Sequence, residues 1–102
     1  MLAPQTVLFS SRVYSIEIIK KAAYRLSDVV CIDIVPRLDE IECVLHFVSD
    51  VKDETMAQRI VIAFKNEVLD QDLRSIIAKE TEATRNAVLA FALSKTGLQG
   101  GE

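Results

Sequence analysis

Apolar and polar residues alternate near the start of the chain, which is the pattern of a half-buried strand. Val7, Phe9 and Val13 alternate with polar residues over 6–14. Ser15 follows and has a side chain that favours the N-cap position of a helix. The next apolar residues recur at helical spacing: Ile16, Ile19, Ala23 and Leu26. This part of the chain therefore predicts a strand and then an amphipathic helix of about three turns.

Two further runs, 29–35 and 41–48, are rich in β-branched and apolar residues, and Pro36 ends the first of them. If residues 38–39 form the tip of the connecting turn, the two runs pair as a hairpin with one wholly apolar face. This register pairs Val30 with Phe47, Ile32 with Leu45, and Ile34 with Cys43. A shift by one residue would place Asp33 in the apolar face, so the first register is favoured.

Neither glycine nor proline occurs between Pro36 and Gly97, and the composition from Glu54 onward is typical of helix. The apolar positions form two stripes on opposite sides of an ideal helix. The first contains Met56, Ala57, Ile60, Phe64 and Val68, and the second contains Leu69, Leu73, Ile76 and Ile77. Either the helix breaks or kinks near Leu69 and Asp70, or one continuous helix packs its two halves on different surfaces.

Two local signals in this half allow other boundaries. Residues 59–64 contain three consecutive β-branched side chains, which also fit a short strand. Thr81 is a candidate N-cap for a last helix over 82–94, and Gly97 is a candidate stop signal.

These elements predict an α+β fold with a small β-α-β-β sheet layer and two or three C-terminal helices. The sheet is expected to be antiparallel or mixed and covered on one face. The length of 102 residues fits a single domain over 1–102, with flexible ends at 1–5 and 97–102.

Composition excludes several classes of protein. Half of the residues are hydrophobic (50%), 26% are charged, and only three glycines and two prolines occur, which excludes disorder and low complexity. The uncharged stretches at 1–11 and 86–94 are too short to span a membrane. The N-terminus lacks the basic region of a secretory signal, so a cytoplasmic location is expected. A net charge of −3 argues against a nucleic-acid partner. The high apolar content indicates surface that is buried against a partner.

Candidate chemistry is sparse. His46 is the only histidine, and in the favoured register it lies opposite Cys31. A thiol beside an imidazole could form a nucleophile pair or half of a metal site. The alternative is a surface histidine beside a small side chain. Cys31 and Cys43 are too far apart for a CxxC motif, so both are expected to be reduced, buried and apolar in behaviour. No phosphate-binding, dinucleotide-binding or hydrolase motif occurs, so neither a cofactor nor a metal is expected.

The densest polar segment runs over Asn66-Glu67-Val68-Leu69-Asp70-Gln71-Asp72-Leu73-Arg74 and continues to Lys79-Glu80-Thr81. On a helix, Asp70 and Arg74 are i,i+4 neighbours, as are Glu67 and Gln71, which is typical of a solvated face with weak pairs. Paired carboxylates could instead bind a divalent cation, but Asp70 and Asp72 point apart on a helix.

This polar segment, together with Val13-Tyr14-Ser15 and Ala22-Ala23-Tyr24 upstream, resembles the hallmark of the HxsD family of His-Xaa-Ser system proteins. The resemblance spans most of the chain. It implies a gene neighbourhood with a protein bearing His-Xaa-Ser repeats and two radical S-adenosylmethionine (SAM) enzymes, which looks like a peptide-modification system.

Three hypotheses for function follow. The first is a non-catalytic accessory protein that binds the precursor peptide, as an added strand at a sheet edge, or docks on a maturation enzyme. The second is a structural module that forms a homodimer, and the third is a small enzyme that uses Cys31 and His46. The candidate partner-binding residues are Asn66, Glu67, Leu69, Asp70, Leu73, Arg74, Glu80 and Thr81.

Overall fold

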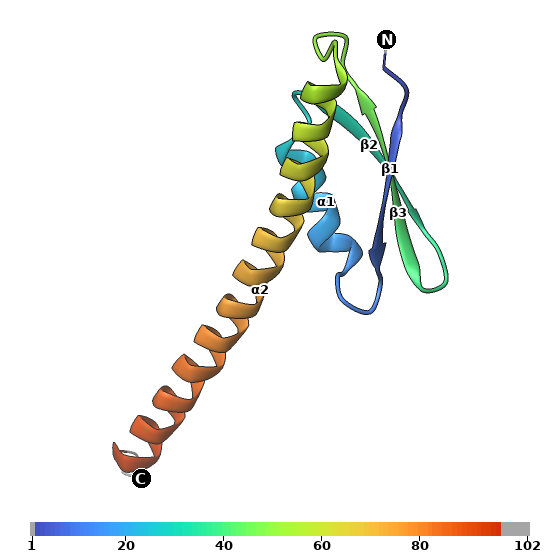
Figure 1. The fold of residues 1–102 in the computed structure, drawn as a ribbon. Helices are drawn as coiled ribbons and strands as arrows, with labels where there is room; N and C mark the ends of the chain where they lie inside the picture. The colour runs from blue at the N-terminus through green and yellow to red at the C-terminus, as the bar shows by residue number, and fades with distance from the viewer. Residues whose placement is uncertain (1, 97–102) are drawn as a thin grey trace. The chain divides into compact units, whose positions relative to one another are not determined.

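The computed structural model describes residues 2–96, with side chains described up to residue 92. It contains five elements in chain order (Figure 1): β1 (Gln5–Ser10), α1 (Ile16–Arg25), β2 (Val30–Pro36), β3 (Glu40–Phe47) and α2 (Glu54–Thr96). The chain divides into two compact units, Met1–Asp72 and Leu73–Glu102. The first unit contains the sheet, α1 and the first part of α2, and the second contains the rest of α2.

The three strands form one antiparallel sheet in the order β1-β3-β2, so that β3 is central. β2 pairs with β3 in the register expected from the apolar pattern, with Ile32 opposite Leu45 and Ile34 opposite Cys43. β1 pairs with the other side of β3, with Val7 opposite Cys43. The predicted α+β class and hairpin register are therefore confirmed, and of the two sheet types expected, antiparallel or mixed, the structure has the antiparallel one.

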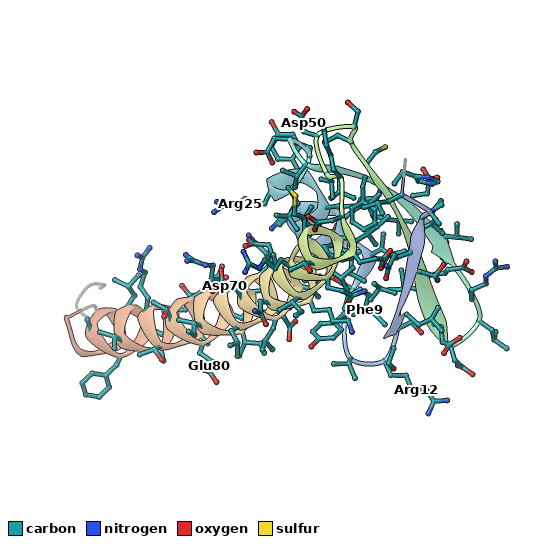
Figure 2. All side chains as sticks on the ribbon, turned by 45° about the horizontal axis from the view of Figure 1, so that its top comes forward. Phe9, Arg12, Arg25, Asp50, Asp70 and Glu80 are labelled. Atoms are coloured by element: carbon teal, nitrogen blue, oxygen red, sulfur yellow. The ribbon has the colours of Figure 1, made fainter. Side chains whose placement is uncertain are left out.

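One face of the sheet forms the core of the first unit, because α1 and the first part of α2 both lie on that face (Figure 1). Phe64 of α2 is fully buried, and its ring meets that of Phe9 edge to face with centroids 5.6 Å apart. Figure 2 shows Phe9 pointing from the sheet toward α2. The buried residues are Val7, Phe9, Ile18, Ile19, Ala22, Val30, Ile41, Cys43, Leu45, Phe47, Val51, Ala57, Val61, Phe64 and Val68.

The start of α1 has the predicted cap. The Ser15 side chain accepts a hydrogen bond from the Ile18 backbone N–H at 3.2 Å, which satisfies one of the donors that a helix start leaves free. The preceding strand is shorter than predicted and ends at Ser10, because the N–H groups of Val13 and Tyr14 turn back to donate to the Ser10 carbonyl.

The buried face of α1 differs from the predicted stripe. Ile18, Ile19 and Ala22 are buried, whereas Ile16 is exposed. The predicted members Ala23 and Leu26 are half-buried at the edge of the core. The helix is therefore rotated by a fraction of a turn from the orientation that its apolar spacing indicated.

The C-terminal half is a single helix and not the two or three that were predicted. Residues 59–64 are helical, which excludes the strand alternative. Thr81 lies inside α2 and is not an N-cap, because the helix continues without interruption before it. The predicted stop at Gly97 and the predicted flexible end at 97–102 lie outside the described residues.

Candidate functional site

Four of the candidate partner-binding residues lie on the part of α2 that belongs to the first unit. Asn66, Leu69 and Asp70 are exposed, whereas Glu67 is half-buried. The Glu67 Oε2 atom accepts a hydrogen bond from the Gln71 Nε2 atom at 2.8 Å. It also lies 3.7 Å from the Arg25 Nε atom at the end of α1. Glu67 therefore connects the two helices that cover the sheet.

The other four candidates, Leu73, Arg74, Glu80 and Thr81, lie on the part of α2 that belongs to the second unit, and all are exposed. In that unit none of the described side chains, residues 73–92, is buried. Its large apolar side chains are exposed by 45–65%, and we call them the distal apolar set: Leu73, Ile76, Ile77, Val88, Leu89 and Phe91. A helix with no core of its own normally buries such residues on another surface.

The outer face of the sheet carries the residues of the enzyme hypothesis. Cys31 lies opposite His46, as the predicted register requires. The His46 Nε2 atom is 3.1 Å from the Asp33 Oδ2 atom, so a carboxylate orients the imidazole. Sequence reasoning did not identify Asp33 as this partner, although its position two residues after Cys31 places both on the same face of β2.

The side chains of Cys31, Asp33 and His46 form a row that is open to solvent. The side chains of His46 and Asp33 are 46% and 65% exposed, so water screens their charges and no dry cavity strengthens them. Over the described part of the chain, no group of three or more His, Cys, Asp or Glu side chains could hold a metal ion.

The two cysteines have different environments, which corrects the expectation that both are buried. Cys43 is fully buried in the core, but Cys31 is exposed, because it lies on the opposite face of the sheet from Cys43. Burial, with a smaller contribution from the Glu42 carboxylate, raises the pKa of the Cys43 thiol from 9.0 to about 11. Cys43 is therefore an unreactive thiol at neutral pH.

Among the described residues, no helix is both long and apolar enough to cross a bilayer.

The chain matches a known protein family. The family model described as His-Xaa-Ser system protein HxsD matches residues 9–99, which include both helices, all three strands in whole or in part, and the whole polar segment of α2. No curated protein and no solved structure matches the chain. Since the family match covers most of the 102 residues, this chain belongs to the HxsD family of His-Xaa-Ser system proteins.

Proposed function

We propose that this chain is a non-catalytic accessory protein of a His-Xaa-Ser system that docks on a maturation enzyme and binds the precursor peptide. Membership of the HxsD family supports the link to this system. The resemblance further implies that the enzymes are radical SAM enzymes and that the precursor carries His-Xaa-Ser repeats.

The observation that carries the docking role is the distal apolar set of α2. Its six side chains are each exposed by 45–65%, including Phe91 at 65%. Fully burying one Leu, Ile, Val or Phe side chain contributes about 1.5–3 kcal/mol. Burial of several of these side chains on a partner would therefore offset much of the free-energy cost of the freedom lost on association.

The non-catalytic role is supported by the exposed arrangement of Cys31, Asp33 and His46, and by the absence of a nucleotide-binding motif in the sequence. The enzyme partner would then supply the chemistry.

The test is a binding measurement with the two radical SAM enzymes whose genes the resemblance places beside this one. Each enzyme is purified and titrated with the wild-type chain, the Leu73→Asp variant and a control. Leu38→Asp is a matched control, because Leu38 is 94% exposed in the turn between β2 and β3. We expect Leu73→Asp to weaken binding to one enzyme by at least about tenfold, since it places a charge in an apolar interface. Leu38→Asp should bind as the wild type does.

Light scattering on the protein alone completes the test. A wild-type dimer that Leu73→Asp converts to a folded monomer would assign the distal apolar set to self-association, as in the homodimer alternative. Binding to neither enzyme would contradict the docking role.

A further inference from the structure

The outer edge of β2 has backbone groups available for another strand. In an antiparallel pair, alternate residues direct their N–H and C=O groups toward the partner strand and away from it. The Arg37 N–H donates to the Glu40 carbonyl at 2.7 Å, and the Val48 N–H donates to the Val29 carbonyl at 3.2 Å. The odd-numbered residues of β2 therefore bond to β3, and the even-numbered residues direct their groups outward.

The two ends of this edge are closed. At one end, the outward N–H of Val30 donates to the Leu26 carbonyl at the end of α1. At the other end, Pro36 lies at an outward position, where its missing N–H costs β2 no bond to β3. Between them, Ile32 and Ile34 each direct one N–H and one C=O away from the sheet.

A groove follows this open edge. It has a volume of about 330 Å³ and lies between α1 and β2, with Lys20, Ala23 and Tyr24 on the helix side and Val30, Ile32 and Ile34 on the strand side. Ala23, Ile32 and Ile34 are half-buried, so the groove has an apolar floor. Tyr24 is 78% exposed and can cover an added side chain. An added strand would thus gain both backbone hydrogen bonds and side-chain contacts, as in other complexes formed by strand addition.

The charge beside the groove selects the partner. Lys20 borders it, and Lys20, Lys21, Tyr24 and Arg25 also border a neighbouring depression of about 390 Å³. Arg25 is paired with Glu67, but neither lysine forms an ion pair with any described residue. Two unpaired ammonium groups favour a segment that carries carboxylates.

We propose that an extended acidic peptide segment binds as a fourth strand along the outer edge of β2, in the groove between β2 and α1. In the accessory role, this groove is the surface that binds the precursor peptide. The proposal rests on that role only for the source of the peptide.

The test uses a phage-displayed library of random peptides of about ten residues, a length that spans the open edge with flanking residues. We expect the recovered peptides to alternate apolar residues with others and to contain Asp or Glu. Synthetic fluorescein-labelled copies are then titrated against the variants by fluorescence anisotropy. The double variant Lys20→Glu, Lys21→Glu should bind at least about tenfold more weakly, and Lys65→Glu, on the exposed surface of α2, should bind as the wild type does.

The backbone contribution is tested with proline. Ile34→Pro removes one outward N–H from β2 without removing a bond to β3, and should weaken binding by at least about tenfold. Leu8→Pro is the matched control on β1. The Ser11 N–H donates to the Asp39 carbonyl, so the even-numbered residues of β1 face outward on the opposite edge of the sheet. Circular dichroism checks the fold of each variant, and the lysine variants decide the outcome if Ile34→Pro does not fold.

Three results would overturn the inference: recovery of no binding peptide, recovery of peptides that bind the lysine variants unchanged, or a β2-to-β2 dimer in the wild type. Peptides that bind at β2, together with a failure of both radical SAM enzymes to bind, would instead contradict the docking role alone. Binding of the His-Xaa-Ser precursor that survives the lysine and proline substitutions would leave the accessory role standing and reject the groove.

Discussion

Arg25 at the end of α1 lies with its Nε atom 3.7 Å from the Oε2 atom of Glu67 on α2. The Glu67 side chain is only 19% exposed, and it also accepts the hydrogen bond from Gln71. Both residues belong to the first unit, so Glu67 connects the two helices that cover the sheet. At least one residue of the polar segment thus has a role inside the protein, whatever its neighbours on α2 contact.

The strength of this connection can be measured with Glu67→Ala. We expect a loss of about 0.5–1 kcal/mol in the free energy of unfolding, because the Arg25 side chain is 66% exposed and water screens the pair. The coupling energy comes from a double-mutant cycle. Urea denaturation is measured for the wild type, Glu67→Ala, Arg25→Ala and the double variant. A coupling energy near zero would show that the pair does not hold the helices together.

Phe64 is the large residue on which the core depends. It is fully buried, and it contacts Phe9 across the interface between α2 and the sheet. Phe64→Ala should lower the free energy of unfolding by about 3–5 kcal/mol, since it leaves a cavity as well as losing apolar burial. Ile62→Ala, two residues earlier and 56% exposed, should cost less than about 1 kcal/mol. Thermal unfolding of the two variants measures both losses. Equal losses of stability in Phe64→Ala and Ile62→Ala would contradict the packing of α2 on the sheet.

The two thiols should differ in reactivity. Cys31 is exposed and Cys43 is buried, so a disulfide reagent at neutral pH should label one thiol rapidly and the other only as the protein unfolds. In Cys31→Ser the rapid phase should vanish and the slow phase remain. A rapid phase that persists in this variant would place Cys43 within reach of solvent.

Stability should fall at alkaline pH because of Cys43. Its pKa is 9.0 in the unfolded chain and about 11 in the folded one, so above pH 9 the unfolded state loses its proton first. Below pH 9 the thiol is protonated in both states, and the free energy of unfolding does not change on its account. Between pH 9 and about pH 11 the free energy of unfolding falls by at most about 1.4 kcal/mol per pH unit. Urea denaturation between pH 8 and about 10.5 should show a smaller decline in Cys43→Ala than in the wild type. The same decline in both proteins would assign the effect to other groups.

The sheet could be predicted in detail because its pattern has a period of two. Asp33 cannot enter the apolar face at a low cost, and this single restriction selected the register that pairs Ile32 with Leu45. Ser15 could be recognised as the N-cap for a similar reason, since few side chains accept a hydrogen bond at that position.

The continuity of α2 could not be predicted from the change of stripe at Leu69. The change marks the residue at which packing on the sheet stops, after the buried Val68, and the backbone remains helical beyond it. The contacts between Arg25 and Glu67 and between Asp33 and His46 were also missed. The first depends on the angle between two helices and the second on side-chain orientation, and neither is encoded in the spacing of residues along the chain.

The central position of β3 has a consequence for the order in which the sheet assembles. β2 reaches β3 through a turn of a few residues, whereas Ser10 of β1 pairs with Glu40 only after the chain has closed a loop through α1. Closing the longer loop costs more entropy, so we expect the hairpin to form early and β1 to join it late. Native-state hydrogen exchange should then release the amides of β1 at a lower opening free energy than those shared by β2 and β3.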